Sequence, residues 1–130
     1  MSEKSSQDVC MCALDGIMDL LGKKWALFAI NAIGNHGSVR FKDLYGELRG
    51  VSPSTLSSIL RQLESRGIVN RRPYAEIPPR VEYSLTENGA RMREAVLPLL
   101  VWASLQDDYS KQAEGCVPSQ YVKVSLAGRR

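Results

Sequence analysis

Apolar residues recur at intervals of three and four along the first half of the chain, which is the spacing of side chains on one face of a helix. This spacing predicts an amphipathic helix over residues 12–21. The next stretch, residues 24–33, is apolar on most sides, so we expect a helix at the centre of the core. A short strand is predicted next, at 39–41. It is followed by a third apolar stripe over residues 41–48, which predicts a helix of about two turns.

The clearest helix start is the pair Ser52 and Pro53, a capping residue followed by the residue preferred at the first helical position. The predicted helix runs over residues 53–66 and ends at Gly67, which can adopt the left-handed conformation. About four residues separate it from the preceding helix, which is short enough for the sharp angle of a helix-turn-helix. Its buried face is expected to hold Leu56, Ile59, Leu60 and Leu63.

Residues 71–89 have the pattern of two short strands joined by a stiff tip. Pro78 and Pro79 lack amide hydrogens and have a fixed φ, so the tip cannot continue the strand ladder. Apolar and polar positions alternate in the second strand, which predicts one buried and one exposed face. The apolar positions are Val81, Tyr83 and Leu85. A basic hairpin that projects from a domain in this way is a wing.

Beyond the hairpin, Thr86 can cap another helix, which Pro98 should kink or restart. Apolar residues continue along this helix to Leu105. The resulting surface is too apolar for so small a domain to leave exposed. The amphipathic first helix is a natural partner, and together the terminal helices predict a dimer interface. Residues 121–126 fit either a late strand or an ordered tail.

With 130 residues and 44% hydrophobic content, the chain is expected to form a single domain over residues 1–130. It has a core at 12–105, a polar arm at 1–9 and a tail at 107–130. The fold class is mainly α with a small β-hairpin (α+β), a winged helix-turn-helix whose terminal helices form a dimer interface. The apolar runs are too short to span a bilayer, so we expect no membrane partner and a cytoplasmic location.

The formal net charge of +3 is unevenly distributed along the chain. Residues 40–80 carry eight Lys or Arg and four acids, a net charge of +4, while residues 1–39 carry −1 and residues 81–130 balance. The excess positive charge therefore lies in the segment that contains the helix-turn-helix and the start of the wing. Such a patch is an electrostatic footprint for phosphate, although a solvated basic face would have the same charge.

The face of the 53–66 helix opposite its leucines carries small hydroxyls and one long cation. Hydroxyls near a helix N-terminus can donate to phosphate oxygens, and the free amides of the first turn attract anions. An arginine two turns further on can reach a guanine edge or a phosphate. Ser52 is better explained as a cap. The predicted DNA contacts on this helix are Ser54, Thr55, Ser57, Ser58 and Arg61.

Three more cations are candidate DNA contacts outside this helix. Arg72 and Arg80 flank the wing tip from opposite strands, so both can reach a phosphate or a narrow minor groove while the helix occupies the major groove. Lys42, at the start of the preceding helix, is a candidate contact to the DNA backbone, and simple solvation explains it equally well.

These elements, in this order, resemble the HxlR-type winged helix-turn-helix regulators, relatives of the MarR family, over residues 12–102. The resemblance is carried by CALDGIMDLLGKKW at the opening helix, VSPSTLSSILRQLESRGIV at the recognition helix and RRPYAEIPPRVEYSLTENG at the wing. It implies a homodimer formed by terminal helices, bound to an inverted-repeat operator in double-stranded DNA, with the recognition-helix residues in the groove. Ser54 departs from the basic residue that the family often has there, and the tail at 107–130 is longer than the usual family end.

The resemblance also bears on the cysteines, because many family members carry a cysteine at the position of Cys12, and in some of them it senses oxidants. A thiol near a helix start is stabilised as the reactive thiolate, although Asp8 and Asp15 would oppose that shift. A small buried residue is the alternative. Three cysteines are an odd number, which excludes a complete set of disulfides within one chain and favours a reducing compartment. Cys10 and Cys12 are too close for the usual zinc spacing, so no metal site is predicted.

An enzyme is not expected. The chain has no glycine-rich phosphate loop, no Ser-His-Asp set and no paired acids in an apolar setting, and His36 lies in a predicted turn without a partner. No cofactor is predicted. Two classes remain: a dimeric, sequence-specific DNA-binding regulator that acts as a repressor, with redox control through Cys12, and a winged helix used only as a protein-interaction module. The second needs no localised basic charge, so the hydroxyl-and-arginine face favours the first.

Overall fold

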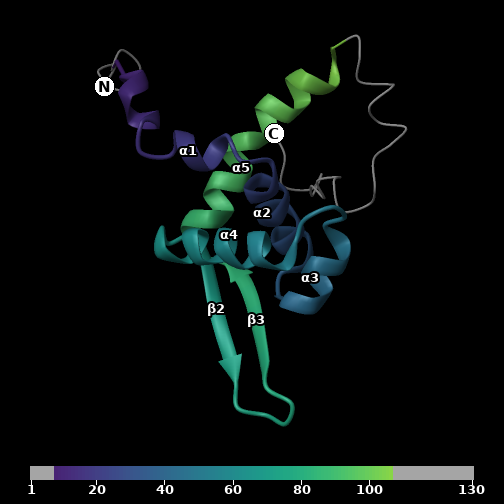
Figure 1. Cartoon of the computed structure of the whole chain (residues 1–130). Coiled ribbons are helices and arrows are strands. Elements are labelled where there is room, and N and C mark those ends of the chain that lie inside the picture. The colour runs from purple at the N-terminus through teal and green to yellow at the C-terminus, as the bar shows by residue number, and fades with distance from the viewer. Residues whose placement is uncertain (1–7, 107–130) are drawn as a thin grey trace.

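The structure, a computed structural model, describes residues 8–106 of the chain (Figure 1). Helices pack around the central helix α2, and a β-hairpin extends beneath α4 (Figure 1). This confirms the predicted fold class, mainly helical with a small antiparallel sheet. In chain order the elements are the 3₁₀ helix η1 (Met11–Leu14), α1 (Met18–Leu21), α2 (Lys24–His36), β1 (Val39–Arg40), α3 (Phe41–Glu47), α4 (Pro53–Ser65), β2 (Val69–Tyr74), β3 (Arg80–Leu85) and α5 (Glu87–Ser104).

Helix α2 lies at the centre of the core, as its apolar character predicts. It packs against α1, α3, α4, α5 and β3, and its small alanines allow these neighbours to approach closely. The helix extends past its expected end at residue 33 to His36, so the predicted turn starts later than expected. The residue that ends it is Gly37, whose φ of +81° is left-handed and whose amide donates to the Ile33 carbonyl. Its buried residues are Ala26, Ala29, Ile30, Ala32 and Ile33.

Helix α4 follows the sequence prediction closely. The Ser52 hydroxyl accepts a hydrogen bond from the Thr55 amide at 3.1 Å, and Pro53 is the first helical residue. The chain leaves the helix through Gly67, whose φ is +74°. Its four buried residues are the predicted Leu56, Ile59, Leu60 and Leu63. The helix is therefore fixed to the core by one apolar stripe, which leaves its other faces open.

The wing consists of β2, the tip at residues 75–79 and β3. Strand β3 is central in a three-stranded antiparallel sheet of order β1-β3-β2, so the short strand predicted at 39–41 is confirmed. Tyr83 of β3 faces Val39 on one side and Arg71 on the other, and it is only 9% exposed. Because strand side chains alternate, Val81 and Leu85 share its face, as predicted.

Helix α5 begins at a capped and tightly packed first turn. The Thr86 hydroxyl accepts from the Gly89 amide at 2.9 Å and also donates to the Gly67 and Ile68 carbonyls. The helix then continues through Pro98 to Ser104, so Pro98 does not restart it. None of the helices in residues 8–106 is long and apolar enough to cross a membrane.

The single helix predicted over residues 12–21 is wrong. The segment instead forms η1 and the one-turn helix α1, and Ile17 between them has a non-helical backbone with φ of −123°. The physical reason is burial: Leu20 is the only residue of these two segments that the structure buries. Helices this short need tertiary packing, because their hydrogen bonds alone do not offset the cost of nucleation. The late strand or tail expected at 121–126 lies outside the described residues.

Candidate nucleic-acid interface

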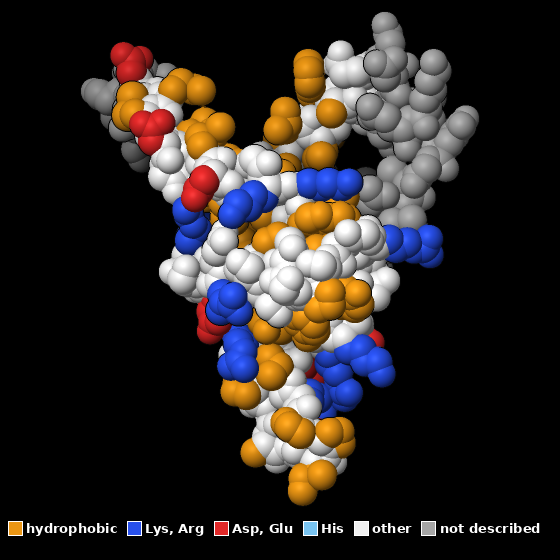
Figure 2. Space-filling view, in the orientation of Figure 1, with side chains coloured by type: hydrophobic (Ala, Val, Ile, Leu, Met, Phe, Trp, Pro, Cys, Tyr) orange, Lys and Arg blue, Asp and Glu red, His pale blue; other side chains and the backbone are white. Residues whose placement is uncertain are grey.

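Helix α4 presents a polar, mostly uncharged face to solvent. The five contact residues predicted on this helix all lie on that face: Ser54, Thr55 and Arg61 are exposed, and Ser57 and Ser58 are half-buried. Figure 2 shows this as a white band across the middle of the molecule, where Figure 1 places α4, with Lys and Arg side chains around it. Small side chains of this kind allow the helix backbone to come close to a partner surface.

The first turn of α4 is organised by Ser52. In addition to accepting from the Thr55 amide, its hydroxyl lies 2.9 Å from the Thr55 hydroxyl and 3.3 Å from that of Ser54. The preference for Ser52 as a cap is therefore confirmed. The turn gathers three hydroxyl groups beside the N-terminal amides of the helix, where the backbone dipole attracts anions.

Two lysines at the start of α2 join this face, although neither was predicted as a contact from the sequence. Lys23 and Lys24 line a groove together with Ser54, Thr55 and Ser58 of α4. The Lys23 ammonium donates to the Gln62 side-chain oxygen at 3.1 Å. The Lys24 ammonium lies 4.9 Å from the centre of the Trp25 ring and 5.7 Å from that of Phe28, a cation–π arrangement.

The net charge counted segment by segment gave no sign of these lysines. They belong to the segment 1–39, whose net charge is −1. However, one of the acids in this segment, Asp19, forms an ion pair with Arg66 at the C-terminal end of α4, with a shortest N–O distance of 3.0 Å. The useful signal was the position of Lys23 and Lys24 at the start of the helix that packs against α4.

The two wing arginines differ in their surroundings. The strand register places Arg72 opposite Glu82, and Tyr74 opposite Arg80, so all four lie on one face of the hairpin. Arg80 is half-buried, pairs with Glu76 at 3.1 Å and with Glu82 at 3.2 Å, and lies 4.0 Å from the centre of the Tyr74 ring. Arg72 is exposed, 5.9 Å from the same ring. The charge of Arg80 is thus balanced within the wing, whereas Arg72 projects to solvent.

Lys42 is exposed on α3 but is not brought to the α4 face. It lines a separate hollow with His36, Glu47 and Glu82, to which no α4 residue contributes. In that hollow the His36 Nε2 atom lies 2.6 Å from the Glu47 carboxylate. The prediction that His36 has no partner is therefore wrong, because α3 folds back beside the end of α2, a contact between elements that local sequence does not show.

The N-terminal cysteines are paired. Cys10 and Cys12 form a disulfide in the structure, and both residues are exposed. The alternative of Cys12 as a small buried residue is therefore wrong. The Cys10 sulfur also accepts from the Cys12 amide at 3.1 Å, at the start of η1. In residues 8–106, no group of three or more His, Cys, Asp or Glu side chains is arranged to hold a metal ion.

A capped helix in a helix-turn-helix, flanked by a three-stranded sheet with a projecting hairpin, defines the winged helix-turn-helix class of DNA-binding proteins. Comparison with known families agrees: the family described as HxlR-like helix-turn-helix matches residues 20–111. The chain belongs to this family, and its relatives are transcriptional regulators rather than enzymes.

Individual relatives cover most of the chain. The HTH-type transcriptional regulator sll1512 of Synechocystis is 42% identical over 106 residues, which is 82% of this chain and 75% of that protein. Among solved structures, the reduced form of the transcriptional regulator YodB from B. subtilis is 29% identical with a TM-score of 0.67, and the match covers 78% of this chain and 97% of YodB. The redox regulator HypR in its oxidized form is 33% identical with a TM-score of 0.66, over 75% of this chain and 99% of HypR.

Proposed function

We propose that this protein is a dimeric, sequence-specific repressor that binds an inverted-repeat operator in double-stranded DNA. The observation that carries the proposal is the exposed face of α4. It combines small hydroxyls, a capped N-terminus and the long cation Arg61 with the adjacent ammonium groups of Lys23 and Lys24. Such a face can enter a major groove, read base edges through Arg61 and hold phosphates at the helix start. In this proposal the bound dimer represses transcription because it occupies the promoter. The protein acts in the cytoplasm, where its operator DNA lies.

The wing has a different role in this proposal. Arg72 supplies a free positive charge for a phosphate or for the minor groove, while Arg80 keeps the hairpin in shape through Glu76 and Glu82. Phosphate contacts set register and affinity, so sequence choice rests mainly with α4. Lys42, in its separate hollow, is at most a peripheral backbone contact.

Dimerisation is proposed from the exposed apolar residues at the two ends of the described chain. Near the end of α5, Trp102 is 60% exposed and Leu105 is 76% exposed. Figure 2 shows hydrophobic side chains along both upward projections, which Figure 1 identifies as the N-terminal segment and the end of α5. Apolar surface of this extent is unusual on a monomer, and a second copy related by a two-fold axis would cover it. The same axis would match the symmetry of an inverted repeat. The contributing residues are Val9, Met11, Met18, Leu99, Leu100, Val101, Trp102 and Leu105.

Redox control through Cys12 is the regulatory part of the proposal. Cys10 and Cys12 are exposed and close enough to be paired, so an oxidant can reach them. Their oxidation forms one S–S bond and passes two electrons to the oxidant with release of two protons. Three similar solved structures, of two proteins, have names that refer to redox state or treatment: YodB in its reduced form and after diamide treatment, and the redox regulator HypR in its oxidized form.

The test is fluorescence anisotropy with labelled DNA from upstream of the protein's own gene, measured over a series of salt concentrations. Arg61→Ala should weaken specific binding by about 1 to 3 kcal/mol, roughly fivefold to 150-fold, with less effect on scrambled DNA. Arg91→Ala is the matched control, because Arg91 is exposed on α5 and paired with Glu87 at 2.8 Å. If Arg61→Ala binds as well as wild type, the groove assignment fails. If neither protein prefers the upstream DNA to scrambled DNA, the proposed regulator function fails and the protein-interaction module is favoured instead.

The redox part is measured in the same assay with reduced and oxidised protein. Oxidation should change operator affinity in the wild type and leave Cys12→Ser unaffected, since the variant cannot form the disulfide. Equal affinities of the two wild-type forms would remove redox control from the proposal without affecting the DNA assignment.

A further inference from the structure

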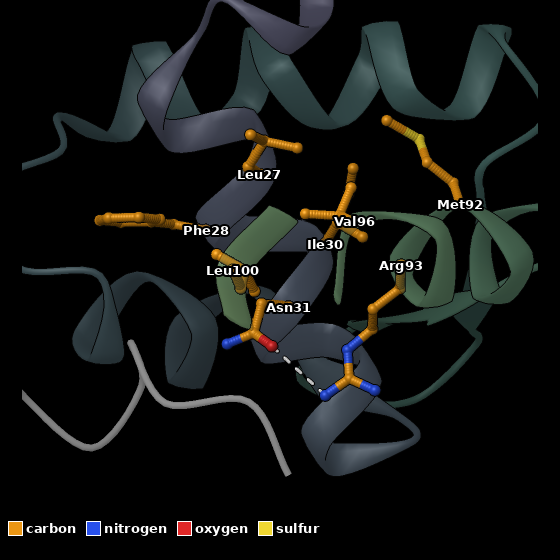
Figure 3. A pocket seen from close by; sticks show the side chains of 8 residues that line it. All are labelled: Leu27, Phe28, Ile30, Asn31, Met92, Arg93, Val96 and Leu100. Carbon is orange, nitrogen blue, oxygen red and sulfur yellow. Dashed lines mark hydrogen bonds between the residues drawn. The ribbon is translucent and has the colours of Figure 1, made fainter. Parts of the chain in front are cut away.

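The tip of the wing carries a large apolar side chain that nothing in the domain covers. Ile77 is fully exposed (101%), and within residues 8–106 no other large hydrophobic side chain is as exposed. Elsewhere apolar side chains lie together: Leu27 and Val96, for example, line one pocket between α2 and α5 (Figure 3). Figure 2 shows hydrophobic side chains at the lower end of the molecule, which Figure 1 identifies as the end of the hairpin.

The residues around Ile77 make the tip apolar and stiff. The prolines have a fixed φ, so the loop loses little conformational entropy when a partner immobilises it. The one charged tip residue, Glu76, is paired with Arg80 at 3.1 Å, so its charge is balanced within the wing. The other four of the five tip residues are apolar and exposed: Ala75, Ile77, Pro78 and Pro79. The surface that the tip offers to a partner is therefore hydrophobic.

The position of the tip indicates what the partner is. It lies on the opposite side of α4 from the N-terminal segment and the end of α5, so the proposed dimer interface does not cover it (Figure 1). Arg71 and Arg72 are exposed on β2, the strand that leads to the tip. This strand spans roughly 17 Å at about 3.3 Å per residue. Half a turn of B-DNA, the step from a major groove to the next minor groove, is also about 17 Å. With α4 in the major groove, the hairpin is long enough for its tip to reach the minor groove of the same duplex.

We propose that Ile77 enters this minor groove and inserts partly between two base pairs, so that the operator bends. The inference rests on the proposed DNA binding and adds a deformation of the duplex to it. An aliphatic side chain forms no hydrogen bond with a phosphate or a base edge, but it can occupy the space between two base pairs that have lost their stacking. Pyrimidine–purine steps such as TA open most easily, so Ile77 selects sequence without a hydrogen bond. Arg72, in contrast, acts through its charge.

The first test measures the bend of the upstream DNA fragment by energy transfer between dyes at its two ends, with the full chain bound. The wild type should shorten the end-to-end distance. Ile77→Ser should lose at least about half of this change and bind at least about fivefold more weakly, with an unchanged salt dependence because no charge is removed. An unbent wild-type complex, or an equal bend with Ile77→Ser, overturns the inference. In the second case a protein partner better explains the exposed tip.

Two variants control for the substitution itself. Ile77→Leu keeps an aliphatic side chain and should bend the fragment as the wild type does. Ala75→Ser introduces the same hydroxyl two residues away on the exposed tip, and it should also leave the bend unchanged. Because Ile77 is fully exposed, Ile77→Ser should unfold at the wild-type Tm, so a lost bend does not reflect a lost fold. An equal loss of bend in Ala75→Ser or Ile77→Leu contradicts the insertion of Ile77.

The second test locates the opened base step. 2-Aminopurine, a base whose fluorescence rises when it is unstacked, is placed in turn at each position beside the bases that α4 contacts. The wild type should raise the fluorescence at one step, and Ile77→Ser should not. The same response to both proteins would refute the insertion. The two proposals fail in different ways: Arg61→Ala binding as well as the wild type removes the DNA assignment of α4. Binding that depends on Arg61, with a bend that does not depend on Ile77, removes only the insertion.

Discussion

The first turn of α5 offers a sharp test of the fold, through a glycine that has no space for a side chain. A Cβ atom on Gly89 would lie 2.1 Å from the Ile68 carbonyl oxygen and 3.0 Å from the Ile68 carbonyl carbon. The same carbonyl oxygen accepts hydrogen bonds from the Thr86 amide at 3.0 Å and from the Thr86 hydroxyl at 3.2 Å. In Gly89→Ala, the start of α5 must therefore move away from Ile68, and the Thr86 contacts move with it.

The expected magnitude follows from these contacts. Displacement weakens the Thr86 cap, which contributes about 1 kcal/mol, and a hydrogen bond to Ile68, which contributes about another 1 kcal/mol. The higher helix propensity of alanine offsets at most about 1 kcal/mol. Residual overlap with backbone atoms adds about 1 to 3 kcal/mol of strain. We expect Gly89→Ala to lower the free energy of unfolding by about 2 to 4 kcal/mol.

The assay is thermal unfolding followed by far-ultraviolet circular dichroism, at equal protein concentration because an oligomer's Tm depends on it. At about 4 °C per kcal/mol for a domain of this size, Gly89→Ala should lose at least about 8 °C in Tm. Gly46→Ala is the matched control: Gly46 is exposed in α3, and its Cβ would meet no atom within 4 Å. It should leave Tm unchanged or raise it by a few degrees, about 0.4 to 1 kcal/mol. If Gly89→Ala is as stable as Gly46→Ala, the close packing of α5 on Ile68 is refuted.

Three further predictions concern the surfaces. Trp102→Glu should weaken the dimer at least about tenfold in sedimentation, because it places a charge in the proposed apolar interface, while Ile77→Glu at the exposed wing tip should sediment as wild type. Lys23→Ala should reduce the slope of log affinity against log salt concentration by about one phosphate contact, whereas Lys42→Ala should reduce it less. Equal effects of the two substitutions would contradict the separation of the two sites. Ser52→Ala should lower the free energy of unfolding by about 1 kcal/mol through loss of the α4 cap, and an unchanged Tm would show that the cap is dispensable.

Local signals in the sequence sufficed where the controlling contacts are close along the chain. Ser52, Pro53 and Gly67 mark both ends of α4, because capping and left-handed φ depend on neighbouring residues. The period-two alternation around Tyr83 likewise predicted which face of β3 is buried. Local patterns failed at residues 12–21, where a regular apolar spacing lacks the packing that a helix needs.

The sequence by itself determined the winged helix-turn-helix, the bounds of α4 and the residues on the exposed face of that helix, since periodicity and caps are properties of single segments. The tertiary structure alone decided which charges are available. It balanced Arg80 with Glu76 and Glu82, brought Lys23 beside Gln62, and packed Arg93 against Gly34. These outcomes rest on contacts between segments distant in the sequence, and charges interact through space, so no count along the chain reveals which cations are neutralised.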